Sequence, residues 1–274
     1  MVFVRLRSGD YLYSRFAKAR QGILILPTDI LFYCVAGVAV ILVGLAKGGF
    51  AGLGAAAMPL LALVMDPVAG AGMLLPILMV QDVVSVWAFR RSYDRRTLLL
   101  TLPGAAIGIF LAWLLASVIN EDAVRGFVGV IALAFGTYRL LPLMGMQMKL
   151  TGPAPKWIGT VMGGVSGFTS QIAHAGGPPF QIWALSRNFP HLVFVGTSSI
   201  FFTIINWMKV PAYAALGQFN RENMTLTAVF LPLAILSTVA GVQLVKRVSP
   251  ERFNIIIQLL MVVIGAELIR QAIW

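Results

Sequence analysis

The chain consists largely of apolar stretches, each about 20 residues long, which is the length a helix needs to cross the hydrocarbon core of a bilayer. Short breaks that carry the charged residues separate these stretches. Helices are expected because lipid offers no partner for open backbone groups, and the stretches lack the alternation of barrel strands. We predict eight spans, at 30–48, 70–89, 98–119, 123–141, 157–170, 191–214, 224–245 and 253–272.

The composition excludes a soluble fold. Charged residues make up 11% of the chain, hydrophobic residues make up 59%, and the mean hydropathy is +0.87. A soluble protein of 274 residues needs more polar surface than this to cover its core. The sequence therefore predicts an all-α integral membrane protein whose nearest partner is membrane lipid.

Several functional classes lack their signals. The net charge of +11 comes from Lys and Arg in the breaks between spans, where they meet lipid headgroups, so we expect no nucleic acid partner. The single cysteine, Cys34, forms neither a disulfide framework nor a CxxC pair. HExxH, GxSxG and P-loop motifs are missing, and no second His or Cys stands at metal spacing. We therefore expect no enzyme activity, no catalytic residues, no cofactor and no metal site.

The breaks divide the chain into four parts. Residues 1–29 are basic, with no small-residue cleavage site after them, and are expected to form a cytoplasmic leader. Residues 30–142 form a first transmembrane repeat, 143–156 a cytoplasmic linker and 157–274 a second transmembrane repeat.

Ordered landmarks support two homologous halves. Gly48-Gly49-Phe50-Ala51-Gly52 resembles Gly163-Gly164-Val165-Ser166-Gly167 at an offset of 115, and Asp94-Arg95-Arg96 resembles Asn220-Arg221-Glu222. Further pairs are Pro59 with Pro178, Pro103 with Pro232 and Gly136 with Gly265.

Two stretches, 49–66 and 171–187, are apolar but short and crowded with Gly or Pro. The Arg-rich break at 90–96 is expected in the cytoplasm, as is the leader, while the acidic break at 120–122 is expected outside. An even number of crossings must then separate residues 30 and 90, which makes 49–66 a re-entrant element and the repeats parallel. The basic break at 246–252 disagrees with this model. Full crossing by both stretches would instead give ten spans and inverted repeats.

The duplicated glycine-rich segments are the predicted binding site. Glycine costs a helix about 1 kcal/mol and an interior proline about 3, so broken helices are expected here, with N–H groups facing a cavity that holds an anion. Close helix packing through small residues is the alternative. The predicted substrate-binding residues are Lys47, Gly48, Gly49, Gly52, Gly54, Pro59, Gly163, Gly164, Gly167, Ser170, Gln171, His174, Gly176, Gly177, Pro178 and Asn206.

Ionisable residues inside spans are costly, so they are candidates for function. Asp82 lies well within 70–89 and could load and release a proton, or it could reach water or Arg90 at the cytoplasmic end. Lys47 could serve as the counter-charge of an anion and His174 as a donor to it. Asn206, together with Thr203 and Lys209, could complete a polar pocket opposite Asp82.

GGFAGLGAAAMP and GGVSGFTSQIAHAGGPP, with the break Tyr93-Asp94-Arg95-Arg96 before Leu102-Pro103-Gly104, resemble the sulfite exporter TauE/SafE family from residue 30 onward. The resemblance implies a multi-pass carrier of sulfite, sulfonate or a related organic anion in a bacterial inner membrane. It departs after Gly167, where four extra residues including His174 precede the proline, and after Pro232, where the Gly104–Gly108 spacing has no clean counterpart. Alternating access with a proton as candidate coupling ion is the leading hypothesis. An uncoupled channel, an intramembrane enzyme and an assembly subunit are the alternatives, and a homo-oligomer stays open.

Overall fold

The computed structural model describes residues 29–50, 52–116, 118–144, 155–245 and 251–274, and its secondary structure in these ranges is helical throughout. The prediction of an all-α multi-pass protein is confirmed. The predicted leader, 1–29, and most of the linker, 143–156, lie outside the described residues. The elements are α2 (Ile30–Lys47), η1 (Leu53–Ala56), α3 (Ala57–Ala62), α4 (Pro67–Phe89), α5 (Arg95–Leu115), α6 (Glu121–Leu140), η2 (Leu141–Met144), α7 (Lys156–Ala173), α8 (Gly177–Leu185), α9 (His191–Ala215), α10 (Arg221–Leu244) and α11 (Glu251–Ile273).

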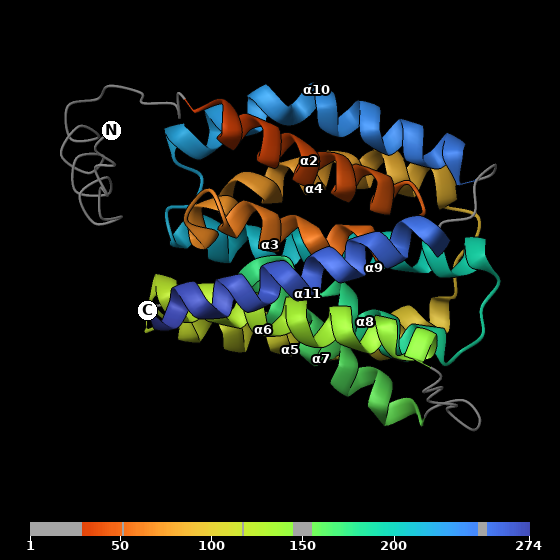
Figure 1. Cartoon of the computed structure of the whole chain (residues 1–274). Helices are drawn as coiled ribbons and strands as arrows, with labels where there is room; N and C mark the ends of the chain where they lie inside the picture. The colour runs from red at the N-terminus through yellow and green to blue at the C-terminus, as the bar shows by residue number, and fades with distance from the viewer. Residues whose placement is uncertain (1–28, 51, 117, 145–154, 246–250) are drawn as a thin grey trace, which may run out of the picture.

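Seven of the described helices are long and apolar enough to cross a membrane: α2, α4, α5, α6, α9, α10 and the 255–273 part of α11. The remaining predicted span, 157–170, corresponds to α7, which has 18 residues but is not one of these seven helices. The long helices run roughly side by side along the bundle (Figure 1).

Polar caps in the breaks decide where several helices begin. At five helices an Asp or Asn side chain accepts a hydrogen bond from a backbone N–H of the first turn at 2.7–2.9 Å, which satisfies a group that the helix itself leaves open. The caps are Asp29, Asp66, Asp94, Asn120 and Asn220.

Helix α2 packs parallel to α10. A Cβ on Gly44 would lie 1.9 Å from the Ser237 hydroxyl oxygen, and one on Gly48 would lie 2.4 Å from the Gly241 Cα, so residue numbers rise together along the pair. Helix α10 is also parallel to α4, because Thr227 donates to the Met73 carbonyl and Gln81 donates to the Ala234 carbonyl. Helices α2 and α4 therefore run in the same direction.

This direction corrects the expectation of a re-entrant segment and parallel repeats. If α2 and α4 run the same way, the short pair η1–α3 must carry the chain back between them, so residues 30 and 90 lie at opposite ends of the bundle. The second half runs the other way: α9 is antiparallel to α4, as shown by the pairs Asp82–Asn206 and Ser85–Ser199. The structure therefore matches the inverted alternative, in which both short segments carry the chain across.

The order of helices occurs twice: one long, one short and three long. Helix α7 begins 126 residues after α2, α9 begins 124 after α4, and α10 begins 126 after α5. If the two halves are aligned at an offset of 126 residues, Gly163 is equivalent to Gly37 and not to Gly48. The glycine runs that we paired at an offset of 115 are therefore not at equivalent places, although homology of the halves stays a prediction.

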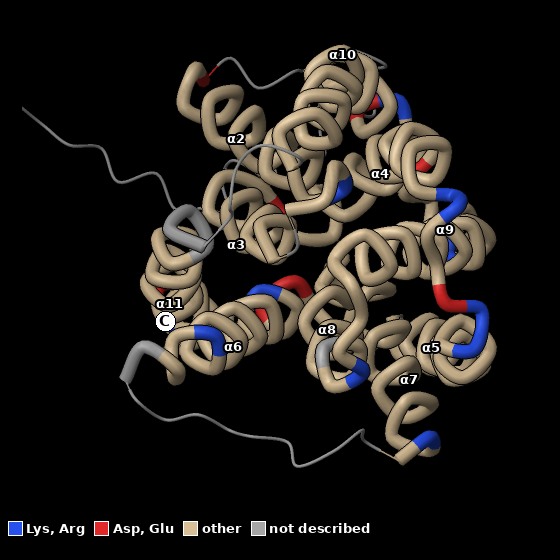
Figure 2. The backbone as a smooth tube through the Cα atoms, turned by 90° about the vertical axis from the view of Figure 1, so that its right-hand side faces the viewer, with Lys and Arg blue, Asp and Glu red and all other residues tan. Residues whose placement is uncertain are grey.

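The inverted arrangement also removes the charge conflict at the basic break 246–252. The ends of α4 and α10 lie at the same end of the bundle, because the two helices are parallel. The Arg-rich break at 90–96 and the basic break at 246–252, of which 251 and 252 are described, therefore adjoin one side. Figure 2 looks onto this end and shows Lys and Arg at several helix ends. By the positive-inside rule we expect this end to be cytoplasmic, and α2 would then begin outside, which disagrees with the cytoplasmic side predicted for the leader.

Labelling of single cysteines should show these two sides. In a Cys34→Ser background, we expect an impermeant thiol reagent to modify Asp29→Cys and Asp122→Cys from outside intact cells. Arg91→Cys should react only in inside-out vesicles, because α2 and α4 are parallel. Labelling of Asp29→Cys and Arg91→Cys from the same side would contradict the inverted arrangement. All three replaced residues are exposed.

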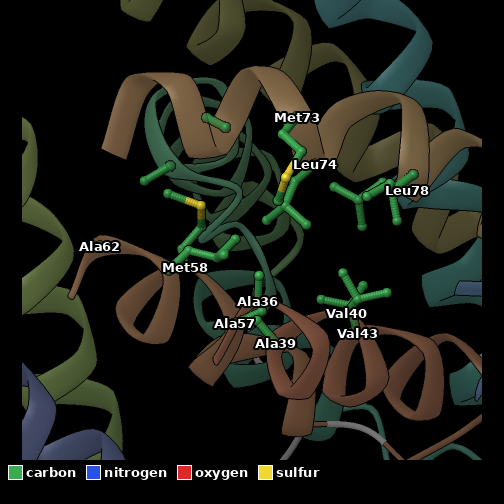
Figure 3. Close-up of a cluster of buried hydrophobic side chains, with 14 of the residues drawn as sticks. Ala36, Ala39, Val40, Val43, Ala57, Met58, Ala62, Met73, Leu74 and Leu78 are labelled. Atoms are coloured by element: carbon green, nitrogen blue, oxygen red, sulfur yellow. The ribbon is translucent and has the colours of Figure 1, made fainter. Parts of the chain in front are cut away.

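A hydrophobic core fills the space between α2, α3 and α4. Figure 3 shows side chains of the three helices pointing toward one another, among them Ala36, Val40, Met58 and Leu74, all at most 3% exposed. This core fixes the position of α3 against the two long helices and so forms one wall of the cavity described next.

Candidate functional site

A cavity of about 120 Å³ lies inside the bundle, which is large enough for a small solute rather than one water molecule. The beginnings of both short segments border it, with parts of α2, α4, α7 and α9. The lining residues are Val43, Ala46, Lys47, Gly52, Gly54, Ala55, Ala57, Met58, Leu74, Leu78, Ser170, His174, Gly177, Gln181, Phe194, Val195, Ser198, Ser199, Phe202 and Asn206.

Two chain reversals in left-handed backbone conformations border this cavity. Helix α2 ends at Lys47, and Gly49 and Gly52 have φ of 122° and 102°, values at which glycine avoids a steric penalty. Helix α7 ends at His174, whose φ is 50° although it carries a side chain. This conformation costs an L-residue about 1–2 kcal/mol, and the hydrogen bonds of the His174 ring offset it.

An ion pair joins the end of α2 to the middle of α4. The Lys47 ammonium donates to Asp82 Oδ1, and the other carboxylate oxygen, Oδ2, accepts from Asn206 Nδ2 at 2.7 Å. Asp82 is 1% exposed and does not line the cavity, whereas Lys47 and Asn206 both do. The carboxylate therefore holds two lining residues from the two halves of the chain.

Asp82 and Asn206 are also at equivalent places, since each is residue 16 of its helix. If the halves are inverted repeats, their hydrogen bond lies close to the axis between them. One turn further along α4, the Ser85 hydroxyl bonds the Lys47 carbonyl oxygen at 2.7 Å and the Ser199 hydroxyl at 2.6 Å. Polar contacts at the centre of the bundle thus link α2, α4 and α9.

A second cation, Lys209, lies behind the opposite wall. Its side chain is fully buried, and Nζ lies 2.8 Å from His174 Nδ1, 3.1 Å from the Ser170 hydroxyl and 3.3 Å from the Ser170 carbonyl oxygen. His174 Nε2 lies 2.8 Å from the Ala71 carbonyl oxygen, which can only accept, so Nε2 carries the ring proton and Nδ1 accepts from Lys209. His174 is therefore an uncharged acceptor for this ammonium.

One lining hydroxyl has an unmet hydrogen bond. Ser198 Oγ is buried and has no hydrogen-bond partner among the described residues. Buried hydroxyls are nearly always paired, so an orphan at a cavity wall indicates a site for a bound molecule.

The structure brings together part of the predicted site. Asp82 supports the site through its hydrogen bonds with Lys47 and Asn206. The predicted residues that line the cavity are Lys47, Gly52, Gly54, Ser170, His174, Gly177 and Asn206. Those outside its lining are Gly48, Gly49, Pro59, Gly163, Gly164, Gly167, Gln171, Gly176 and Pro178.

The predicted helix break at 163–167 differs from the structure, because α7 is continuous through this segment. A Cβ on Gly163 would lie 2.1 Å from the Thr101 carbonyl oxygen, and one on Gly167 would lie 2.2 Å from the Ala105 carbonyl oxygen. These glycines allow α7 to approach the backbone of α5, which is the close-packing alternative. Gly48 makes the same kind of approach to Gly241.

The short helices supply fewer backbone donors than we expected. Helix α8 begins at Gly177, and the next two residues, Pro178 and Pro179, have no N–H. Only Gly177 can therefore offer a backbone N–H among the first three positions of α8. Side chains must supply most of the donors of a site here.

Sequence reasoning placed Lys209 in a candidate polar pocket without counting it among the binding residues, and it did not identify Ser85, Ser198 or Ser199. Lys209 had a usable signal, since a lysine in the middle of an apolar span is costly unless it serves a purpose. The three serines had none, because serine is common in membrane helices and its partners lie on other helices.

A family model described as "Sulfite exporter TauE/SafE" matches residues 36–268. The searches of curated proteins and of solved structures returned no match. No group of three or more His, Cys, Asp or Glu residues suited to a metal ion occurs in the described ranges.

Proposed function

Because the chain belongs to the sulfite exporter TauE/SafE family, a family of membrane transporters of sulfite or related anions, we propose that it is a secondary carrier that binds one small anion in the central cavity. The observation that carries the proposal is the pair of lysine side chains at the cavity, Lys47 in its lining and Lys209 behind the lining residues Ser170 and His174, together with the unpaired hydroxyl of Ser198 in the lining. Cations inside a membrane protein are costly and mark ion pathways.

The lining offers donors suited to an oxyanion. Lys47 Nζ has two N–H groups beyond the one directed at Asp82, and the Ser198 hydroxyl is unpaired. The Ser170 oxygen can accept from Lys209 while its own proton points elsewhere, so this hydroxyl can donate to a bound anion. Charge-assisted hydrogen bonds of this kind are roughly twice as strong as neutral ones.

The inverted halves support alternating access. Inverted repeats commonly place a substrate site at the interface of the halves, near the middle of the membrane, and rocking of one half against the other opens the site to each side in turn. Here the site is made from both halves, and the Asp82–Asn206 hydrogen bond joins them at equivalent positions.

Proton coupling through Asp82 is part of the proposal. Asp82 is the buried carboxylate of the site, and its protonation would weaken the ion pair with Lys47 and change the net charge of the site. An uncoupled channel is the alternative, and it would use the same donors without this step. An intramembrane enzyme or an assembly subunit has no comparable support in the arrangement of the site.

Counterflow in proteoliposomes tests the proposal. We expect labelled sulfite to exchange against unlabelled sulfite and against a singly charged sulfonate such as methanesulfonate, while sulfoacetate, acetate and sulfate serve as comparison anions. Empty liposomes and liposomes with the Lys47→Met variant are the controls. Exchange of no anion, with or without a pH gradient, would rule out the carrier.

The same vesicles test the coupling. The Asp82→Asn variant should lose uptake driven by a pH gradient and keep exchange at equal pH, because an amide cannot carry the proton. Unchanged gradient dependence in this variant would remove Asp82 from the coupling and leave anion binding intact.

A further inference from the structure

Lys209 is a buried cation with no carboxylate of its own. Its three contacts, Ser170 O, Ser170 Oγ and His174 Nδ1, are uncharged, and its side chain is fully buried. Asp82 is committed to Lys47 and to Asn206 instead. A charge buried in this way lacks a counter-ion, and burial of an unpaired charge is unfavourable.

The cavity lies between the residues that hold Lys209 and the Lys47–Asp82 ion pair. Ser170 and His174, which hold the Lys209 ammonium, both line the cavity, and Lys47 lines it from α2. The ionisable groups at or directly behind the walls are Lys47, Asp82, His174, Lys209 and Tyr213. His174 is neutral in its hydrogen-bond arrangement, and Tyr213 donates to the Gln171 carbonyl oxygen and so keeps its proton.

We infer that Lys209 is a specificity-determining residue that matches the cavity to a singly charged anion. When an anion occupies the cavity and Lys209 carries its proton, two ammonium groups and one carboxylate leave one net positive charge, and the anion supplies the missing negative charge. A dianion would leave one negative charge without a partner among the residues at the walls of the cavity. The inference rests on the proposed function and narrows its substrate class to monoanions, such as hydrogen sulfite or a sulfonate.

Lys209 does not line the cavity, so its effect on a bound anion is transmitted by the lining residues and not by direct contact. The Ser170 hydroxyl carries its effect: the oxygen accepts from Nζ at 3.1 Å, which polarises the O–H bond toward the cavity. Removal of Lys209 should therefore change which charge the site prefers.

Competition by two sulfur oxyanions tests this. Methanesulfonate and sulfate are both tetrahedral, but they carry one and two negative charges around neutral pH. We expect methanesulfonate to inhibit labelled sulfite counterflow at a concentration at least about tenfold lower than sulfate, because one unpaired charge in a site of low dielectric has an effect of this size or more. The assay uses the full chain at equal pH on both sides, so that no gradient contributes.

Variants then shift the charge of the site in defined steps. Asp82→Asn raises the net charge to two and should move the preference toward sulfate by about tenfold or more. Lys209→Met lowers the net charge to zero and should weaken inhibition by methanesulfonate. The double variant Asp82→Asn, Lys209→Met restores a net charge of one and should restore inhibition by methanesulfonate. Lys156→Met, which removes an exposed lysine at the start of α7, should leave the ratio unchanged.

The outcomes separate the inference from the proposed function. If sulfite exchanges but sulfate competes as well as methanesulfonate, or if neither competes, the inference is wrong and the carrier stands. If Lys209→Met keeps the wild-type ratio, Lys209 does not set the preference. If Lys209→Met fails to fold, Asp82→Asn alone decides, since no gain for sulfate in this variant contradicts the charge balance. If sulfite does not exchange at all, the proposed function itself fails.

Discussion

Replacement of Lys47 by methionine is expected to abolish anion exchange and to destabilise the protein. The variant removes a lining ammonium and leaves Asp82, which is 1% exposed, without its ion-pair partner. Loss of one member of a buried ion pair typically costs about 3–5 kcal/mol. Loss of a cation in direct contact with the anion should lower exchange at least about 100-fold, since such a contact is worth several kcal/mol at an effective dielectric constant of 20. Sulfite counterflow and thermal unfolding in detergent measure the two effects.

A double variant separates stability from transport. Lys47→Met with Asp82→Asn removes both charges, so it should recover most of the lost stability, because no unpaired carboxylate remains buried. It should not recover exchange, because the lining cation is still absent. Lys156→Met is the matched control, as it removes an exposed lysine from α7. Recovery of exchange in the double variant would mean that Lys47 only neutralises Asp82.

Two neighbouring glycines of α7 should respond differently to alanine. A Cβ on Gly163 would lie 2.1 Å from the Thr101 carbonyl oxygen, so α5 and α7 would have to move apart. Overpacking of this kind usually costs about 1–3 kcal/mol. A Cβ on Gly164 would meet its nearest atom, the Gly104 carbonyl oxygen, at 3.4 Å, which is close to ordinary contact. We expect Gly163→Ala to lower the melting temperature in detergent by several degrees.

Gly164→Ala is the control in the same helix and should leave the melting temperature unchanged or raise it slightly, since alanine favours a helix over glycine by about 1 kcal/mol. Equal effects of the two substitutions would mean that α5 and α7 do not approach as closely as their backbones indicate.

The long helices could be predicted closely from the sequence. The span predicted at 191–214 is α9 at His191–Ala215, and that at 123–141 is α6 at Glu121–Leu140. Apolar length sets these helices, and Asp or Asn caps set several of their starts. The direction of the halves could not be predicted with the same rule, because the short segments, 53–62 and 177–185, are too short to count as spans.

The glycines of the predicted site show why the structural role of each glycine could not be predicted from the sequence alone. Gly52 and Gly163 look alike in sequence, but Gly52 reverses the chain with a φ of 102°, and Gly163 lies inside a helix against another backbone. Both roles require the absence of a side chain. Only the position of α5, which comes from a distant part of the chain, distinguishes them.

The positions of Asn206 and Lys209 opposite Asp82 were predicted in outline, but the contacts of Lys209 were not. The lysine gained its meaning from His174 and Ser170, which lie on a different helix and whose polar atoms face it. A sequence read one span at a time does not show such neighbours.

Each half packs its first helix against the other half: α2 against α10, and α7 against α5. During synthesis, α7 finds α5 already in the bilayer, whereas α2 must wait until α10 leaves the ribosome, on the order of ten seconds later at ordinary elongation rates. Until then the glycine face of α2 meets only lipid or a chaperone. Helix α2, the first of the described helices, is thus among the last to reach its final neighbour, and a chain truncated before α10 would leave α2 without its docking partner.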